Sequence, residues 1–453
     1  MKKLITLVCL SLLKITPFTV FAQNPIIQTK YTADPAPMVY NDTLYLYTSH
    51  DEDNANGFLM KDWLLYTTTD MVNWKDHGVV ASLENFNWVK HDNGAWAVQC
   101  IYRNGKFYLY CPIHGQGIGV LMADSPYGPF HDPLGKKLIK DDHVWNDIDP
   151  TPFIDDDGQA YLYFGNPDVY HVKLNEDMIS YSGEVKKQSI HPYLYQEGPW
   201  MFKHKGRYYL AFASTCCPEG IGYAMAENPE GPWITAGEIM PRTEKSRGNH
   251  PGIVDYKGHT YVFGLNYDIM HYDTYEHHER RSVSVAEMEY NPDGTIKMIP
   301  YWPKEGVKQL EPLNPYNRVE AETMAWGLGV KTEKFKNGGL YVTKIDDGDS
   351  IIVRGADFGY SGAKKFTANI MPFNNEGGNI EIHLDSSHGL LVGILKVKPN
   401  SDKKYKEISC PVKGAMGVHD IFFIFHGNEK KDLFDFDYWK FDSREKNHSK
   451  EKI

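Results

Sequence analysis

The stretch Asn104-Gly105-Lys106-Phe107-Tyr108-Leu109-Tyr110 joins a tight turn to a strand rich in aromatic residues, and the same pattern returns four more times along the chain. The corresponding tyrosines are Tyr45, Tyr108, Tyr161, Tyr209 and Tyr261. Their spacings of 63, 53, 48 and 52 residues suit a unit of about four short strands. Five such units around one axis form a five-bladed β-propeller, which we predict for residues 23–312.

A second set of residues occupies one place in every repeat, 11 or 12 positions before the tyrosine. They are Asp34, Trp96, Asp149, Glu197 and His250. Each lies on the strand before the turn, at the end away from the turn, and the first strand of a propeller blade lines the central channel. The pattern therefore predicts three carboxylates, a tryptophan and a histidine around one opening. Asp-Pro or Gly-Pro in a single copy can be turn punctuation, but three acids in register favour a site.

Such a set of acids is suited to the hydrolysis of acetals. One carboxyl group must be protonated to help the alcohol leave, while a second, ionised, activates water or attacks carbon. A third carboxylate nearby raises the pKa of the acid through repulsion of like charges. We expect Trp96, Phe153 and Trp200 to stack against the apolar face of a sugar. Of Arg280 and Arg281, one is expected to point into the opening and the other to meet solvent or an acid.

Composition limits the classes of partner. The 453 residues carry a formal net charge of −11, with 24% charged and 42% hydrophobic residues, which excludes wholesale disorder and a multi-span membrane protein. The 30 tyrosines, 21 phenylalanines and 39 glycines favour an all-β fold. Because nucleic-acid binders usually carry a basic face, the acidic balance argues against a nucleic-acid partner. Neutral polymers remain open as substrates.

The first 22 residues are typical of a cleaved export signal. A basic start precedes the apolar run Leu4–Leu13, and Val20-Phe21-Ala22 provides a small-residue end. The run is too short to span a bilayer, so we expect a periplasmic or extracellular protein with no membrane span. The five remaining cysteines show no C-x-x-C spacing, and we expect buried free thiols. They are Cys100, Cys111, Cys216, Cys217 and Cys410.

The pattern changes after Pro312. Alternating stretches such as Ile421-Phe422-Phe423-Ile424-Phe425 favour strands that bury one face. We predict a β-sandwich for residues 313–442 and a charged, frayed tail for residues 443–453.

The propeller residues resemble a known enzyme family. Ala33-Asp34-Pro35, Ile148-Asp149-Pro150 and Glu197-Gly198-Pro199 are similar to the three signature segments of glycoside hydrolase family 43, in the same order and at blade spacing. The resemblance implies an inverting mechanism with Asp34 as general base, Glu197 as general acid and Asp149 as modulator of the pKa of the acid. It also implies that His250 lies at the base of the pocket near an ion or water cluster, and that Arg281 reaches the substrate. With Trp96 and Phe153, these two residues complete the predicted substrate-binding set.

The C-terminal part resembles carbohydrate-binding module family 6, a β-sandwich of jelly-roll type. The resemblance rests on Arg318-Val319-Glu320-Ala321-Glu322 and Phe436-Asp437-Tyr438-Trp439, together with segments between them. It implies a structural calcium near Glu320, Glu322 and Asp437, and no cofactor for the chemistry itself. The usual sugar-binding aromatic residues are sparse, since Ser350 stands where an aromatic residue is common.

Propeller and module together resemble enzymes that remove arabinose side groups from xylan. We therefore expect an exo-acting, inverting α-L-arabinofuranosidase that acts on arabinoxylan of the plant cell wall as a monomer. Two alternatives remain open at this point: a β-xylosidase acting on xylo-oligosaccharides, and a non-catalytic glycan-binding propeller. Retention of all three acids argues against the second alternative.

Overall fold

The structure is a computed structural model. It describes residues 23–443 except 56, 140–146, 193, 217, 244–248, 274–279, 373–376, 400–403 and 428–431. The predicted export signal and all but the first residue of the predicted tail lie outside these residues. Across the described part of the chain, no helix has the length and apolar character needed to cross a membrane.

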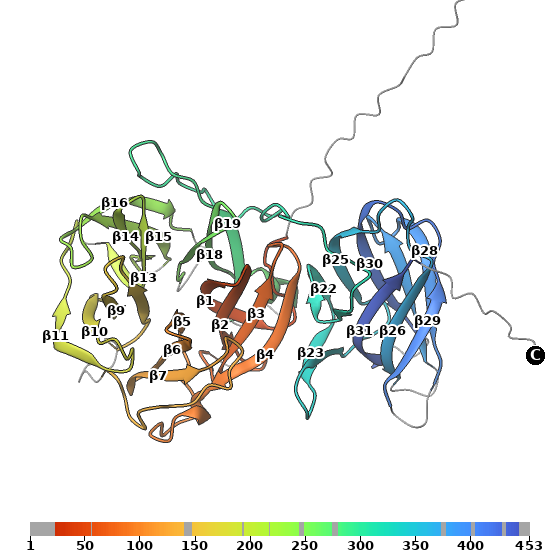
Figure 1. The fold of residues 1–453 in the computed structure, drawn as a ribbon, viewed down its shortest axis with the longest axis horizontal. Helices are drawn as coiled ribbons and strands as arrows, with labels where there is room; N and C mark the ends of the chain where they lie inside the picture. The colour runs from red at the N-terminus through yellow and green to blue at the C-terminus, as the bar shows by residue number, and fades with distance from the viewer. Residues whose placement is uncertain are drawn as a thin grey trace, which may run out of the picture.

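The N-terminal domain consists of five sheets arranged around one axis, antiparallel except where the two-residue β12 pairs in parallel with β16, which confirms the five-bladed propeller (Figure 1). Blade 1 is formed by β1 (Tyr31–Tyr40), β2 (Thr43–Asp51), β3 (Asp62–Thr68) and β4 (Trp74–Ser82), and blade 2 by β5 (Gln99–Arg103), β6 (Lys106–Ile113) and β7 (Gly117–Ala123). Blade 3 is formed by β8 (Thr151–Ile154), β9 (Ala160–Phe164), β10 (Tyr170–Leu174) and β11 (Tyr181–Lys187). Blade 4 is formed by β13 (Tyr195–His204), β14 (Arg207–Ser214), β15 (Gly220–Ala226) and β16 (Trp233–Met240), with the short β12 (Ile190–His191) beside β16, and blade 5 by β17 (Gly252–Tyr256), β18 (His259–Asn266) and β19 (Ser282–Glu287). A 3-10 turn (Leu83–Asn85) and the short helix α1 (Asp268–Asp273) complete the domain.

The repeated aromatic strand is explained by burial on both of its faces. In β2, Leu44 and Leu46 pack into a cluster shared with blade 5, whereas Tyr45 and Tyr47 pack into a cluster shared with blade 2. A strand covered by a neighbouring blade on each side carries apolar or aromatic residues at consecutive positions rather than at alternate ones. The run of aromatic residues is therefore a consequence of stacking blades.

Tyrosine hydroxyl groups also link each blade to the next around the ring. Every link is a hydrogen bond of 2.6–2.7 Å to a backbone carbonyl oxygen in a turn of the following blade. The donor–acceptor pairs are Tyr47 with Pro126, Tyr110 with Met178, Tyr163 with Pro229, Tyr209 with Gly294 and Tyr256 with Asp42. Because a buried hydroxyl must find a partner, these bonds favour one spacing between adjacent blades.

The ring closes through the N-terminal segment. Ile26 donates its backbone N–H to Val283 of β19 at 2.9 Å, and the side chain of Asn24 exchanges two hydrogen bonds with the backbone of Val285. This segment extends blade 5, whose named strands number only three in the described residues, and ties it to the chain that continues into β1.

The C-terminal domain is a sandwich of two antiparallel sheets. One sheet contains β20 (Val319–Glu320), β23 (Lys331–Lys334), β24 (Leu340–Thr343), β26 (Lys365–Pro372), β29 (Lys406–Pro411) and β31 (Phe434–Asp442). The other contains β22 (Trp326–Leu328), β25 (Ser350–Asp357), β27 (Gly378–Leu384), β28 (Leu390–Val397) and β30 (Val418–His426). Phe366, Phe423 and Trp439 meet in the core between the two sheets. This confirms the predicted β-sandwich.

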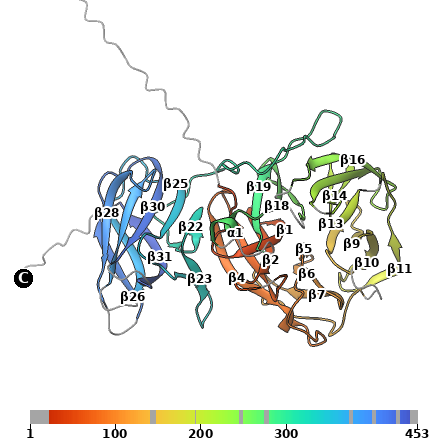
Figure 2. The ribbon, with the colours of Figure 1, turned by 180° about the vertical axis from the view of Figure 1, so that it is seen from behind.

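The sandwich lies beside blade 1, as the views from both sides show (Figures 1 and 2). The two-residue strand β21 (Thr323–Met324) pairs with β4, so the second domain adds a fifth strand to blade 1. Side chains reinforce the contact: Thr332 donates a hydrogen bond to Asp76 at 2.6 Å, and the backbone N–H of Arg354 donates one to Asn73 at 2.8 Å. The two domains are therefore joined at blade 1 by backbone pairing as well as by side-chain hydrogen bonds.

Gly252 allows blades 5 and 1 to approach closely, which gives a test of ring closure. A Cβ atom on Gly252 would lie 2.2 Å from the carbonyl oxygen of Pro35 and 2.5 Å from Cδ of Pro37. We expect Gly252→Ala to lower the free energy of unfolding by about 1–3 kcal/mol, because neither backbone nor proline ring can give way cheaply. Urea denaturation measures this.

Gly393→Ala in β28 is the matched control, because its nearest atoms would lie at 3.2–3.4 Å. It should stay within about 1 kcal/mol of the wild type. Equal losses for both variants would contradict the steric argument.

Candidate active site

A residue with positive φ directly before a proline recurs at the three acids and places their side chains at the mouth of the channel. Asp34, Asp149 and Gly198 each precede a proline and adopt positive φ angles of 50°, 58° and 60°. In β1 and β13 the strand pairing shifts at this point, so one extra residue bulges out of the ladder. A bulge bends its strand and re-aims the side chains next to it. Because positive φ is costly for a residue other than glycine, Asp34 and Asp149 hold stored backbone strain at the site.

Asp34 is fixed by a buried arginine. Nη1 of Arg281 lies 3.0 Å from Oδ1 of Asp34, and the hydroxyl of Ser49 donates to the other carboxylate oxygen at 2.5 Å. Asp51 holds Arg281 in turn, accepting hydrogen bonds from Nε at 3.0 Å and from Nη2 at 2.9 Å. A bidentate carboxylate contact orients the planar guanidinium strongly. Arg281 therefore points into the opening as expected, while Arg280 is buried and lies over the ring of Tyr31 instead of in solvent.

His250 lies among all three acids. Its Nε2 is 3.3 Å from Glu197 and 3.7 Å from Asp149, and its Nδ1 is 3.8 Å from Asp34. Asp149 also accepts the backbone N–H of Gly198 at 3.0 Å, and the side-chain amide of Asn166 donates to Glu197. The predicted proximity of the three acids and the histidine is thus observed.

Burial separates the three acids. The side chain of Glu197 is 19% exposed, whereas those of Asp34 and Asp149 are 4% and 3% exposed. Burial is the main cause that raises the pKa of Asp149 to about 7; the carboxylates of Glu197 and Asp34 act in the same direction, and the charge of His250 opposes them. Burial lowers the pKa of His250, but Asp149, Asp34 and Glu197 together outweigh burial and raise it to about 10. The imidazole is therefore a cation at neutral pH.

These residues border a cavity of about 450 Å³, a size suited to a small organic ligand. Trp96 lines it and stacks on His114, with ring centres 4.0 Å apart and an angle of 14° between the planes. Phe58 also lines the cavity, with its ring centre 6.5 Å from that of Trp96. One wall is therefore aromatic and the floor is charged, as expected for a site that holds a sugar ring above acids.

Two aromatic residues predicted to stack on the sugar lie elsewhere. Phe153 does not line this cavity: it packs edge to face on Tyr208, with ring centres 6.2 Å apart. Trp200 is buried in the propeller core and donates its indole N–H to Ile253 at 2.9 Å. Both side chains therefore pack within the propeller instead of stacking on a ligand in this cavity.

Several lining residues escaped sequence reasoning. They are Phe58, Met60, Asn93, His114, Asn166, Gln196, Cys216 and Glu219. Glu219 is the fourth carboxylate that lines the cavity; it is buried and accepts the backbone N–H of Asn249 at 2.8 Å, next to His250. No motif marks these positions, because they lie in loops or at strand ends outside the repeat.

The cysteine expectation was wrong at one position. Cys100, Cys111 and Cys410 are buried free thiols, as expected. Cys216 is exposed at the cavity and disulfide-bonded. Cys217 lies outside the described residues.

The residues expected to bind calcium do not fit that ion as arranged. The guanidinium of Arg318 lies between two of them, with Nη2 2.8 Å from Glu320 and 3.7 Å from Asp437. Burial raises the pKa of Glu322 to about 8, which favours a neutral carboxyl group. Within the described chain, the ligand atoms of these three residues do not all come within 4.8 Å of one another.

A five-bladed propeller with three carboxylates, a cationic histidine and an aromatic wall around one cavity defines a glycoside hydrolase. The family model described as glycosyl hydrolases family 43 matches residues 22–296, and that of carbohydrate binding module family 6 matches residues 320–443. The chain belongs to glycosyl hydrolase family 43, with a family 6 module at its C-terminal side.

Relatives share both domains or the propeller alone. An arabinoxylan arabinofuranohydrolase from Bacillus subtilis is 36% identical over 93% of this chain and 92% of its own length. A crystal structure of a family 43 arabinoxylan arabinofuranohydrolase from Bacillus subtilis, in complex with cellotetraose, matches with a TM-score of 0.82 and 33% identity, covering 94% of this chain and 99% of that one. A β-xylosidase from Xylanibacter ruminicola is 30% identical over 60% of this chain and 98% of its own length.

The charge cluster predicts how stability depends on pH. Because the pKa values of Asp149 and His250 are raised, the folded protein holds protons that the unfolded chain releases. The free energy of unfolding therefore falls through Asp149 as pH rises from 3.8 to about 7. It falls through His250 as pH rises from 6.5 to about 10. Asp149→Asn removes one raised group and the carboxylate that most raises the pKa of His250. We expect a shallower decline, by at least about 1.4 kcal/mol over that range.

Urea denaturation at pH 6.5 and 9.5 measures the effect. Asp157→Asn, in the exposed β8–β9 turn, should keep the full wild-type decline. An unchanged decline in Asp149→Asn would show that the cluster does not hold the extra protons.

Proposed function

We propose that this protein is an exo-acting, inverting α-L-arabinofuranosidase that removes arabinose side groups from arabinoxylan. The observation that carries the hydrolytic step is the placement of Asp34, Asp149 and Glu197 around one cationic imidazole, at the mouth of a single cavity. Three acids with different exposure and partners can take different roles in one reaction.

The contacts support a division of roles. Asp34 accepts hydrogen bonds from Arg281 and Ser49, which stabilise an anion and aim it, so it suits the general base that activates water. Glu197 is the most exposed of the three acids and suits the general acid that protonates the leaving oxygen. Asp149 is buried behind them, so its charge acts on Glu197 and His250 rather than on substrate.

Whole-length similarity supports the choice of substrate. The arabinofuranohydrolase from Bacillus subtilis, and another from Paenibacillus polymyxa that is 36% identical, match over 93% and 92% of this chain, including the C-terminal module. The β-xylosidase matches over 60% only. β-Xylosidase activity is the second candidate, because that relative is 30% identical over 60% of this chain and 98% of its own length.

One reaction tests substrate and stereochemistry together. Incubation with arabinoxylan, followed by proton NMR from the first minute, should show free arabinose that appears first as the inverted β-anomer. An inverting enzyme places water between base and sugar, so no retained α-anomer should precede it. Release of xylose alone would favour the second candidate, and a first-formed α-anomer would contradict inversion.

A leaving-group comparison tests the assignment of the acid. Glu197→Ala should lose at least about 100-fold in kcat on arabinoxylan, because a sugar alkoxide cannot leave without a proton. The same variant should keep far more activity on a nitrophenyl arabinofuranoside, whose nitrophenolate leaves unprotonated.

Asp34→Ala is the matched variant and should lose activity on both substrates, since its water stays unactivated whichever group leaves. Parallel losses on the two substrates for Glu197→Ala would mean that another residue supplies the proton.

A further inference from the structure

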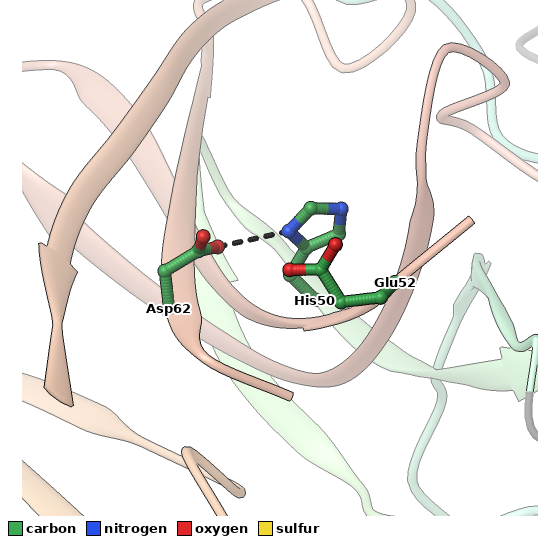
Figure 3. Close-up of side chains that lie close together, drawn as sticks. All are labelled: His50, Glu52 and Asp62. Carbon is green, nitrogen blue, oxygen red and sulfur yellow. Dashed lines mark hydrogen bonds and ion pairs between the residues drawn. The ribbon is translucent and has the colours of Figure 1, made fainter. Parts of the chain in front are cut away.

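A second cluster of ionisable side chains lies outside the active-site cavity, where β2 ends and β3 begins. The ligand atoms of His50, Glu52 and Asp62 all lie within 4.8 Å of one another. Nδ1 of His50 is 2.9 Å from Oδ1 of Asp62. Figure 3 shows the carboxylate of Asp62 pointing toward the imidazole from the opposite strand, with the carboxylate of Glu52 beside the same ring.

Strand register places these groups together. Ser49 pairs with Trp63 in the antiparallel ladder of β2 and β3, which sets His50 opposite Asp62 on one face. Their side chains are 12% and 17% exposed, so they are partly shielded from solvent and still reachable by an ion. The cluster is thus held by sheet geometry rather than by a free loop.

The charge around the cluster favours a cation. Glu52 and Asp62 carry two negative charges, and a protonated His50 offsets only one of them. Two ammonium groups at this end of the sheet pair with other acids: Lys30, whose charge also acts on His50, with Asp76 at 3.2 Å, and Lys331 with Asp53 at 3.0 Å. The three side chains therefore keep a net negative charge even when the histidine is protonated.

A buried hydroxyl beside the cluster is a second, independent observation. Thr48 lies two positions before His50, on the same face of β2, and is fully buried. Its hydroxyl has no hydrogen-bond partner within the described chain. Because buried polar groups in folded proteins are satisfied by protein, water or ligand, this hydroxyl can accept or donate a hydrogen bond to a water molecule on the face of β2 that carries His50.

We propose that His50, Glu52 and Asp62 bind a zinc ion, with water completing its coordination. One imidazole and two carboxylates suit Zn²⁺, whereas Ca²⁺ and Mg²⁺ favour sites made of oxygen alone. Zinc–ligand distances of about 2.0–2.2 Å place ligand atoms roughly 3.3 Å apart in a tetrahedron. The contact between His50 and Asp62 would then open by only a few tenths of an ångström.

The position of the cluster indicates what the ion does. His50 and Glu52 flank Asp51, the residue that holds Arg281 against Asp34. Glu52 and Asp62 also bracket the segment that carries Phe58 and Met60 to the cavity. A zinc ion would tie the two ends of this segment together and fix the strand end beneath Arg281. Zinc is therefore a structural clamp here, and this inference does not depend on which sugar is released.

Zinc binding to the full chain tests the proposal. Protein treated with a chelator and then dialysed is titrated with zinc chloride by calorimetry at pH 7.5, and bound zinc is counted by elemental analysis. The wild type should bind zinc at this site, and its melting temperature should be higher with zinc than without it. His50→Ala and Asp62→Asn should each bind at least tenfold more weakly and lose the shift in melting temperature.

His259→Ala is the matched control. His259 contacts Glu287 at 2.7 Å across β18 and β19, so it also forms a histidine–carboxylate pair on adjacent strands, but no three-residue cluster in the described chain includes it. This variant should bind zinc as the wild type does. A melting scan without zinc shows that each variant is folded.

The active site requires its own control, because the ligand atoms of Asp149, Glu197 and His250 also lie within 4.8 Å of one another. Glu197→Ala should retain the zinc ion whose binding depends on His50. The proposal is overturned if His50→Ala binds zinc like the wild type, if Glu197→Ala alone abolishes binding, or if the wild type binds no zinc at 100 times the protein concentration.

Discussion

Closure of the ring of blades is the constraint on which the active site depends, because no single blade contains more than a fragment of it. Asp34 comes from blade 1, Glu197 from blade 4 and His250 from the entry to blade 5, and they meet only when the N-terminal segment joins β19. The tight contact between Gly252 and Pro35 lies directly beneath His250 and Asp34. The packing between blades 5 and 1 therefore also determines the geometry of the active site.

The irregular backbone before each proline directs the acids into the channel that the blades share. An ordinary strand would direct alternate side chains into the blade interfaces, where a carboxylate would be expensive to bury. At Asp34 and Gly198 one extra residue in the ladder accompanies the positive φ, and at Asp149 the positive φ falls just before β8 begins; each directs an acid toward the channel mouth instead. The strain is offset by hydrogen bonds between neighbouring blades, such as that from the backbone N–H of Gly198 to Asp149.

Sequence reasoning succeeded where the repeat carried the information. Blade stacking forces aromatic runs at a constant period, so the five blades and the three acids could be predicted from spacing alone. It failed where a neighbour is distant in sequence and unmarked by the repeat. Asp51 holds the guanidinium of Arg281, and Glu219 holds the backbone of Asn249 beside His250. Both contacts join residues that come together only in the folded propeller. Phe153 was misplaced because its proximity to Asp149 in sequence said nothing about which face of β8 it occupies.

Electrostatics then separates acids that look alike in the sequence. Each of the three carboxylates contacts His250, yet Asp34 alone is joined to a guanidinium, Asp149 alone accepts a backbone N–H from Gly198, and Glu197 alone is paired with Asn166 and opens to solvent among these three acids. Replacing such a buried ionic network by apolar residues often stabilises a protein, so its retention indicates a chemical use. All three carboxylates share the imidazolium of His250, but each has a different further partner. One small cavity can therefore hold both an ionised general base and a protonated general acid.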